Sequence, residues 1–368
     1  MPIETTGVLE IETKSYGFLR DVESNLARQP GDVFVPPPLI IEHGLLAGAE
    51  ITVLAEEEKP GRVKAVSVEK VEGLDLQAWK ALPRFESLSA ISPEKPLWLE
   101  TKSRNATGRI IDLFAPLGEG QRALIVAPPR SGKTMMLQHI AEALAENHPD
   151  SSLFALLLDE RPEEVTEFRR SIPGTVLSSS YDDSVANHLR LAKLVLDFCK
   201  RKVEAGADVV LLIDSLTRTG RAFNVGQQGS GRLMTGGLDA RALETPKKVF
   251  GAARKVEHGG SLTIIATILV DTGSRMDEFI FEEFKGTGNM ELVLDRSLAD
   301  ERMYPAVNIR DSGTRREEKL FGKNTEAHQK LRRALQKMQP KEALHNTLQL
   351  LQKFPTNKKL LKEFESEM

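Results

Sequence analysis

The sequence predicts an α/β core built on a parallel sheet, with a small β-barrel before it and helices after it. Three observations predict this order. Between residues 106 and about 321, strand and helix patterns alternate, which is typical of a parallel sheet covered by helices. Residues 7–72 contain short strand patterns separated by turn signals. Residues beyond 321 contain only helical patterns.

Length and composition are those of a globular protein with room for two domains. The chain has 368 residues, of which 40% are hydrophobic and 28% are charged. Its single cysteine, Cys199, excludes an intramolecular disulfide framework and is typical of a reducing compartment. The first residues lack the basic and apolar regions of a signal peptide, and no apolar run approaches the ~20 residues of a membrane span. We therefore expect a cytoplasmic protein with no membrane partner.

Charge is distributed unevenly along the chain. The net charge is −3, which by itself argues against a broad nucleic-acid-binding surface. Residues 1–100 hold 10 Lys and Arg against 17 Asp and Glu, a balance of −7, whereas the remainder holds 40 against 36, a balance of +4. Any contact with nucleic acid must therefore be local.

The first 73 residues read as a small OB-like (cold-shock-like) barrel. Five strand patterns and one helical turn, at about 38–46, support it. The strands are expected at 8–11, 16–19, 32–35, 50–54 and 62–71. Tyr16 and Phe18 alternate onto one face, so with Phe34 they either fill the core or present rings for base stacking. The pattern leaves both readings open.

A phosphate-binding loop is the central motif of the chain. Residues 127–134 read Ala-Pro-Pro-Arg-Ser-Gly-Lys-Thr and stand between an apolar strand pattern and a helical pattern. In such a loop, backbone N–H groups and the helix N-terminus surround a phosphate, Lys133 adds a charge, and Thr134 is placed to hold Mg²⁺. Ala127 stands where the general motif has glycine, and the alternative is a chance Gly-Lys-Thr at a helix start. The strand–loop–helix order favours the phosphate site.

Two acidic residues stand at the ends of other predicted strands. Asp214 ends the apolar run 209–213, and Glu160 follows the run 152–158. The carboxyl ends of parallel strands meet at one edge, where α/β proteins bind ligands. Asp214 is thus expected to share Mg²⁺ with Thr134, and Glu160 to orient or deprotonate the attacking water. Each acid alone could be an ordinary helix cap, but their convergence with the loop favours a site.

The remaining segments complete a four-part division. We expect a barrel at 1–73, a connector at 74–105 that contains Trp79 and Trp98 and is packed on its neighbours, an ATPase core at 106–321 and a helical segment at 322–368. The C-terminal helices are expected at 325–337, 340–354 and 357–365. Two loops of the core carry cations: Arg232 in the glycine-rich 226–237, and Arg275 in 271–276, with Lys285 slightly further on. A lone loop arginine is usually a solvated charge, but two such loops from one sheet edge favour ligand contacts lining a ring.

Several motifs together resemble one known family. They are found at 127–134, 157–166, 235–239, 250–254, 283–289 and 312–315. The chain resembles the bacterial transcription termination factors called Rho, which are homohexameric RNA-dependent ATPases and helicases. The similarity runs from Gly7 to the C-terminal helices. It covers Ala127 as well, because the phosphate loop of this family begins Ala-Pro-Pro.

The resemblance implies a RecA-like P-loop ATPase core and assigns roles by position. Lys133 and Thr134 would bind phosphate and Mg²⁺, Glu160 would be the catalytic carboxylate, and Arg315 the arginine finger of a neighbouring subunit. The implied catalytic residues are Lys133, Glu160 and Arg315. The implied ligands of ATP, with Mg²⁺ on Thr134 and Asp214, are Pro128, Pro129, Arg130, Ser131, Gly132, Lys133, Thr134, Met135, Arg161, Asp214 and the adenine-stacking Tyr304. The implied RNA contacts are Tyr16, Phe18, Arg20, Asp32 and Phe34 in the barrel and Arg232, Arg275 and Lys285 in the core.

The implied partners are single-stranded pyrimidine-rich RNA, with a preference for cytosine, and further copies of the chain in a homohexameric ring. RNA polymerase and Nus-type elongation factors are candidate partners. The chain departs from the family in three ways. No helical extension precedes Gly7, no aromatic residue stands at 62–65, and arginine replaces the common lysine at 130, 232 and 275. Two alternatives remain: a Rho-like ATPase with a weakened primary RNA site, acting as a regulator or partner of a paralogue, and a non-catalytic RNA-binding oligomer.

Overall fold

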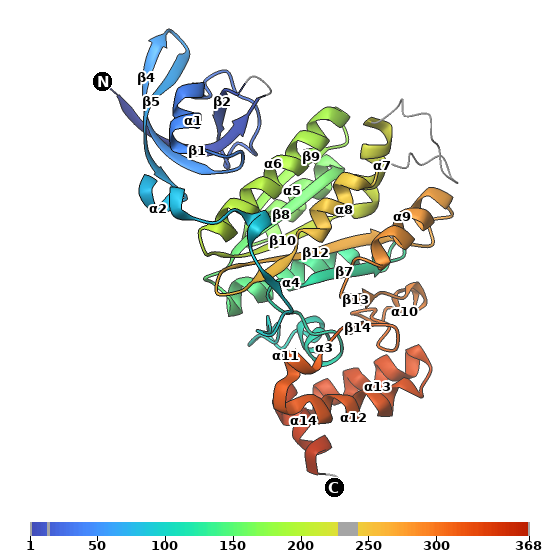
Figure 1. Ribbon diagram of the computed structural model, residues 1–368. Coiled ribbons are helices and arrows are strands. Elements are labelled where there is room, and N and C mark those ends of the chain that lie inside the picture. Colours follow the sequence, from blue (N-terminus) through green and yellow to red (C-terminus); the bar gives the residue numbers. More distant parts are fainter. Residues whose placement is uncertain (1, 13–14, 227–241, 367–368) are drawn as a thin grey trace.

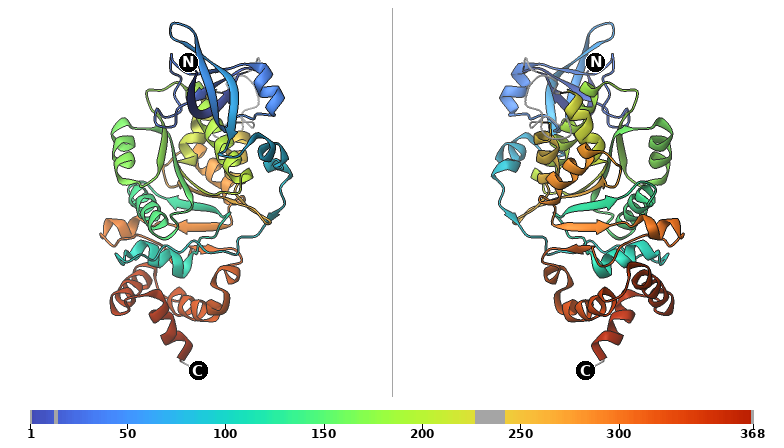
Figure 2. Two further views of the ribbon diagram at one scale, coloured as in Figure 1. Left: turned by 90° about the vertical axis from the view of Figure 1, so that its left-hand side faces the viewer. Right: turned by 90° about the vertical axis from the view of Figure 1, so that its right-hand side faces the viewer.

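The computed structural model describes residues 2–12, 15–226 and 242–366. Three parts follow one another along the molecule: the barrel at one end, a sheet covered by helices in the middle, and a helical segment at the other end (Figure 1). The two ends of the chain lie at opposite ends of the molecule in all views (Figure 2). The predicted order of barrel, α/β core and C-terminal helices is confirmed.

The N-terminal barrel is closed, with strand order β1-β2-β3-β5-β4. Its elements are β1 Ile3–Ile11, β2 Gly17–Arg20, β3 Phe34–Val35, α1 Pro37–His43, β4 Glu50–Lys59 and β5 Arg62–Val71. Alternate residues of β4, namely Ile51, Val53 and Ala55, are buried in the barrel core, as the period of a half-buried strand requires. β1 begins five residues before the predicted strand, because its first half pairs with β4 and its second half with β2.

The connector runs along the outside of the sheet from the barrel toward α3 (Figure 2). It contains α2 Leu76–Ala81, the 3₁₀ turn η1 Phe85–Ser87 and β6 Ala90–Ile91. Asp75 caps α2 by accepting the N–H groups of Gln77 and Ala78. Trp79 is fully buried among the apolar residues of the barrel, and its indole N–H donates to the Gly44 carbonyl at 3.4 Å. Trp98 is half-exposed. The two tryptophans thus have different surroundings.

In the part of the chain that the structure describes, the core holds a nine-stranded sheet with the main order β14-β13-β7-β12-β10-β8-β9. Neighbours from β13 to β9 are parallel, whereas β14 and β11 pair antiparallel at β13 and β12. The nine strands are β6 of the connector, which pairs antiparallel with β11, and β7 Arg122–Ala127, β8 Ser152–Glu160, β9 Thr175–Ser180, β10 Asp208–Asp214, β11 Arg254–Val256, β12 Ser261–Leu269, β13 Met290–Val293 and β14 Gly313–Thr314. β7, β8 and β10 therefore end at one edge, as predicted.

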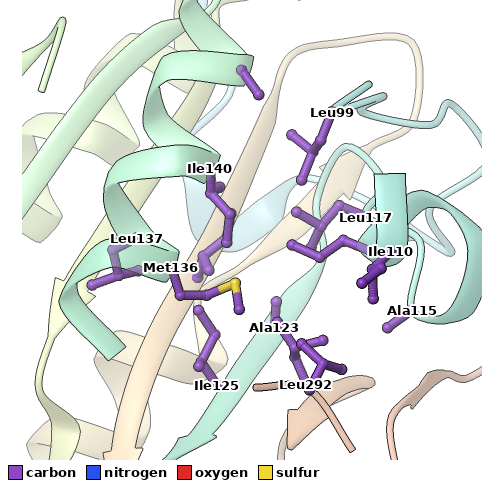
Figure 3. Packing of buried hydrophobic residues seen from close by; sticks show 14 of the residues in the cluster. Leu99, Ile110, Ala115, Leu117, Ala123, Ile125, Met136, Leu137, Ile140 and Leu292 are labelled. Atoms are coloured by element: carbon purple, nitrogen blue, oxygen red, sulfur yellow. The ribbon is translucent and has the colours of Figure 1, made fainter. Parts of the chain in front are cut away.

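Helices cover both faces of the sheet, and side chains alternate between two apolar cores. Ala123 and Ile125 of β7 face one core, where they meet Met136 and Ile140 of α4 (Figure 3), whereas Leu124 faces the other. The helices of this part are α3 Ala106–Phe114, α4 Lys133–Asn147, α5 Pro162–Ser171, α6 Val185–Glu204, α7 Leu216–Gly226, α8 Glu244–Gly251, α9 Arg275–Lys285, α10 Arg296–Asp300 and α11 Glu318–Phe321.

Three C-terminal helices follow the 3₁₀ turn η2 Gly322–Asn324, as predicted. They are α12 Thr325–Gln336, α13 Pro340–Lys353 and α14 Asn357–Ser366. The buried Arg109 of α3 ties them to the core, because its guanidinium donates to the Asn357 side chain at 3.0 Å and to the Leu351 carbonyl at 2.8 Å. Across the described residues, no helix combines the length and apolar character needed to cross a membrane.

The barrel is docked on α6 and β9 of the core. Val8 and Leu26 of the barrel belong to the apolar cluster that α6 forms with the sheet. The Asn25 side chain exchanges two hydrogen bonds with the Ser178 backbone of β9, at 2.5 and 2.6 Å. Gly48 lies directly against the α6 backbone, so that a Cβ there would lie 2.3 Å from the carbonyl carbon of Asp197. A side chain at residue 48 cannot be accommodated without moving the barrel off the helix.

We expect Gly48→Ala to lower the free energy of unfolding by about 2–5 kcal/mol. Gly48 has φ +82°, so alanine loses ~1–2 kcal/mol from the left-handed backbone, and the clash with α6 adds ~1–3 kcal/mol. Gly61→Ala is the matched control, because Gly61 has φ +77° with open space around it. This variant should therefore lose only the stability that the left-handed backbone conformation costs alanine. Urea titration of both variants measures the difference. Equal losses would mean that the close approach to α6 contributes nothing.

Candidate functional site

The phosphate loop has the backbone shape that an anion site requires. Gly132 adopts φ +93° immediately before α4, a conformation that favours glycine. The Ser131 hydroxyl donates to the Pro128 carbonyl at 2.7 Å and closes the loop. No side chain caps the N-terminus of α4, so its first N–H groups point out of the helix toward the loop. A phosphate at this position would receive these N–H groups and the positive end of the helix dipole.

A cavity of about 660 Å³ opens beside this loop. Its size lies within the range of small-molecule sites, which is ~300–1,000 Å³. The lining residues come from the start of α3, the loop, α4 and the segment before Val307: Asn105, Ala106, Thr107, Arg130, Ser131, Gly132, Lys133, Thr134, Met135, Met136, His139, Tyr304, Pro305 and Ala306. Tyr304 is 47% exposed, and its ring carbons lie nearest to a Cβ built on Gly132. An exposed ring beside a phosphate loop offers a stacking surface for a nucleotide base.

Asp214 and Lys133 meet at the end of β10. The Lys133 ammonium is ion-paired with Asp214 Oδ1, and the same oxygen accepts the Thr267 hydroxyl of β12 at 2.8 Å. Thr134, the next residue of α4, also lines the cavity. Carboxylate and hydroxyl oxygens are the ligands that Mg²⁺ prefers, so this donor set fits a magnesium ion shared with nucleotide phosphates.

Glu160 is buried at the same edge, with a side chain turned by an irregularity in β8. The register places Leu158 opposite Ser179 and Glu160 opposite Ser180, so Asp159 is an extra residue with φ +58°. Glu160 is 2% exposed, and Arg218 Nη2 lies 2.8 Å from its Oε1. The geometry of that ion pair lacks an aligned hydrogen bond, so both oxygens are without a hydrogen-bond partner among the described residues. Such a group is costly to bury and is typical of a functional site.

The protonation of Glu160 reflects these surroundings. Burial raises the pKa of Glu160, and the neighbouring Asp214 carboxylate raises it further, whereas Lys133 and Arg218 lower it. The resulting pKa is about 7. A carboxyl with a pKa near neutrality is suited to accept a proton and release it again.

Arg315 does not line the nucleotide cavity of its own chain. It is exposed just after β14 and lines a separate hollow of about 510 Å³, together with Arg310, Glu317 and Arg332. No residue is shared between the linings of the two cavities. Arg161 is also exposed, with its guanidinium 3.9 Å from Glu164 Oε1.

The three predicted rings of the barrel form one cluster, which we call the ring platform. Tyr16, Phe18 and Phe34 have ring centroids 5.7–5.9 Å apart. All three are partly exposed and lie outside the buried barrel core. The register pairs Phe34 with Lys64 of β5, so a lysine stands opposite one ring-bearing residue of the platform. The reading of the rings as core residues is therefore wrong, and their accessible faces suit base stacking.

Arg20 and Asp32, the two predicted polar RNA contacts of the barrel, are ion-paired with each other, and Arg20 lies next to the platform. Arg20 is buried, is ion-paired with Asp32 and donates from Nε to Glu10 Oε2 at 2.5 Å. Its guanidinium carbon lies 5.1 Å from the Phe18 ring centroid. In this arrangement Arg20 supports a ring of the platform and is held by carboxylates.

The predicted cations of the core lie far from the barrel rings in sequence. Arg275 and Lys285 are the first and last residues of α9, both exposed and about 15 Å apart along the helix axis. Arg232, in the glycine-rich loop, lies outside the described residues. The pore-loop reading of these three residues stays a prediction.

Sequence reasoning missed four residues of the nucleotide site. Arg218 pairs with Glu160, and its Nη1 donates to the Asp159 carbonyl at 2.6 Å. Thr107 and His139 share a hydrogen bond of 2.9 Å in the cavity wall. Thr267 holds Asp214, and it was detectable as a polar residue inside the apolar pattern 262–270. Arg218 had a signal as well, since it stands one helical turn after Asp214.

Comparisons with known proteins identify a family for the barrel and another for the α/β core. Residues 5–77 match the family described as Rho termination factor, RNA-binding domain, and residues 108–314 match the ATP synthase alpha/beta family, nucleotide-binding domain. Among solved structures, the chain resembles a prototypical ATPase from the type III secretion system of pathogenic bacteria. That likeness has a TM-score of 0.62 and 21% identity over 75% of this chain and 85% of the other, and it concerns the fold alone.

Relatives with higher identity extend over most of the chain. The transcription termination factor Rho of Cereibacter sphaeroides is 46% identical over 95% of this chain and 85% of its own length. That of Chromobacterium violaceum is 50% identical over 85% of this chain and 76% of its own length. The chain therefore belongs to the Rho family of transcription termination factors.

Proposed function

We propose that this protein is an RNA-dependent ATPase and helicase that moves 5′→3′ along nascent RNA and terminates transcription. The observation that carries the proposal is Glu160, a buried carboxylate with no hydrogen-bond partner among the described residues, beside Lys133 and Asp214. Arg218 is close enough for an ion pair but forms no aligned hydrogen bond to Glu160, whereas a purely structural carboxylate at this depth would be hydrogen-bonded. A non-catalytic RNA-binding oligomer has no use for this arrangement.

In the proposed reaction, the loop N–H groups and Lys133 orient the ATP phosphates. Thr134 and Asp214 would hold Mg²⁺, which neutralises phosphate charge when bound. Glu160 orients the attacking water and accepts its proton, a role that its pKa of about 7 supports. Arg218 adds positive charge next to Glu160. Tyr304 stacks on the adenine ring.

We assign Arg315 to the nucleotide site of a neighbouring subunit in a homohexameric ring. The assignment is supported by the exposure of Arg315 and by its position outside the cavity of its own chain. An arginine supplied by a neighbour stabilises transition-state charge only after assembly, which couples hydrolysis to the ring.

We assign primary RNA binding to the ring platform, with pyrimidine-rich RNA and cytosine preferred. Smaller bases fit a compact three-ring surface, and Lys64 beside Phe34 provides a cation for the phosphate chain. The core cations Arg232, Arg275 and Lys285 would grip RNA in the ring. Such a factor acts on nascent transcripts in the cytoplasm, with RNA polymerase and Nus-type elongation factors as candidate partners.

One alternative keeps a specific observation in its favour. No aromatic residue stands at 62–65, and residues 1–100 have a charge balance of −7. Both features weaken a primary RNA site. The chain would then be a Rho-like ATPase that regulates or assembles with a paralogue.

ATP turnover with and without oligo(C) separates the two functions. We expect oligo(C) to raise turnover at least ~10-fold and to act at lower concentration than oligo(A). Phe34→Ala should raise the oligo(C) concentration needed by roughly 5–150-fold, the equivalent of ~1–3 kcal/mol for one stacked base. Trp98→Ala, which removes a half-exposed ring outside the platform, is the control and should change nothing. Turnover that ignores oligo(C) would favour the regulatory alternative.

The pH dependence of turnover reports Glu160. Only the ionised carboxylate accepts a proton, so kcat/KM for ATP should fall about tenfold per pH unit below pH ~7 and level off above it. Arg218→Met should move this fall in kcat/KM to higher pH, because the Arg218 cation lowers the pKa of Glu160. Arg218→Lys, which keeps the charge, should move it less. Glu160→Gln should still bind ATP but turn over at least ~100-fold more slowly. If kcat/KM fell only below about pH 4.5, the assignment of Glu160 as the proton acceptor would be contradicted.

Mixed subunits test the Arg315 assignment. Arg315→Ala and Lys133→Ala should each be inactive alone, yet mixed rings should recover some turnover. At some interfaces, the intact Lys133 of one subunit meets the intact Arg315 of its neighbour. Mixing Lys133→Ala with Glu160→Gln is the control, because both defects lie in the same half-site and no complete site can form. Recovery in neither mixture would place Arg315 in its own subunit or outside the reaction.

A further inference from the structure

A buried ion cluster lies between the ring platform and the core. Glu10 of β1 is its centre, since Arg20 Nε lies 2.5 Å and Arg190 Nη1 of α6 lies 3.0 Å from Glu10 Oε2. Burial raises the pKa of Glu10, but the charges of Arg190 and Arg20 outweigh this effect and hold it below its usual value. Arg28 completes the pairing at the surface, 2.8 Å from Glu12 and 3.6 Å from Glu10.

Glu10 is also a direct neighbour of the platform. The register of β1 and β2 places Glu10 opposite Phe18, so their side chains stand next to each other on one face. Arg20, the other partner of Glu10, lies against the Phe18 ring. A base that stacks on Phe18 therefore contacts a ring that is packed against Glu10 and Arg20.

From Glu10, polar contacts continue into the core as far as the strand that faces Glu160. Arg190 Nε donates to Asn187 Oδ1 at 3.2 Å, and Asn187 Nδ2 donates to the Ser179 hydroxyl of β9 at 3.3 Å. Ser179 and Ser180 of β9 pair with Leu158 and Glu160 of β8. The N–H of residue 181 donates to the Glu160 carbonyl at 3.0 Å. Glu10, Arg190, Asn187 and residues 179–181 of the β9 segment thus connect the platform with the backbone of Glu160.

Docking of the barrel has contacts outside this relay, although Arg190 Nη2 also donates to the Leu26 carbonyl of the barrel at 2.9 Å. Asn25 and the Ser178 backbone form their own pair of hydrogen bonds, and Val8 and Leu26 are buried against the core. Loss of the Arg190 charge should therefore leave the barrel seated.

We propose that Arg190 is a positioning residue that transmits RNA engagement at the ring platform to Glu160. The side chain of Arg28 is 58% exposed, so an arriving RNA phosphate draws it away from Glu12 and Glu10. Glu10 then relies more strongly on Arg190, and the change reaches Asn187, β9 and the segment that holds Glu160. Contiguous ion pairs and hydrogen bonds of this kind carry coupling between distant sites. The inference rests on the proposed RNA-dependent ATPase activity.

The test measures RNA affinity and ATP turnover separately in the assembled full-length protein. Arg190→Met should bind oligo(C) within about twofold of the parent and keep its RNA-independent turnover, but lose roughly fivefold or more of the stimulation by oligo(C). Arg190→Lys should retain part of the stimulation. Lys193→Met, an exposed cation on the same helix, is the matched control and should behave as the parent.

Asn187→Ala breaks the relay on the core side without touching the barrel, so it should lose stimulation to the same extent. The double variant Arg190→Met with Asn187→Ala should lose no more stimulation than either single variant, because both residues belong to the same chain of contacts. Equal stimulation of the parent, Arg190→Met and Asn187→Ala would overturn the inference. Parallel loss of oligo(C) affinity and stimulation would overturn it too, because Arg190 would then only support the platform. A parent protein that oligo(C) fails to stimulate would instead refute the proposed function.

Discussion

The parallel hydrogen bonds that join β10 to β8 and β12 fix the relative positions of the acidic residues at the sheet edge. In that ladder Asp214 pairs with Leu157, so β8 extends three residues past it and carries Glu160 further out. β12 brings Thr267 next to Asp214. A slip of one residue would turn either carboxylate into the opposite apolar core. Both cores consist of buried apolar side chains, and Figure 3 shows part of one of them. The position of the site is therefore tied to the packing of the whole sheet.

The sequence allowed most of the architecture to be predicted, because its strands and helices have the periodicities of their burial. β4 alternates and the strands of the parallel sheet are apolar throughout, so both types were recognisable. The extra residue Asp159 was not predictable, since a bulge depends on the neighbouring strand. The same limit applies to Thr107, whose role arises from a contact with His139 of α4, far away in the chain. The start of β1 was missed because residues 3–6 are largely exposed and carry little apolar pattern.

Net charge proved a poor guide to the local field of the barrel. Three of its carboxylates, Glu10, Glu12 and Asp32, are paired with arginines, one of which comes from the core. The acidic excess of residues 1–100 therefore does not lie under the rings. Pairing of this kind offsets the desolvation cost of the buried charges by Coulomb attraction and leaves the surroundings of the platform nearly neutral. It also makes the properties of the barrel depend on α6.

Cys199, the single cysteine, has a practical consequence for future experiments. It is fully buried on α6, and burial raises the pKa of its thiol to about 12. A protonated, inaccessible thiol does not react with maleimide dyes. Cysteines introduced on the barrel surface and on the C-terminal helices can thus be labelled in the native background. The separation of those two ends, opposite each other in Figure 2, can then be followed by fluorescence during turnover.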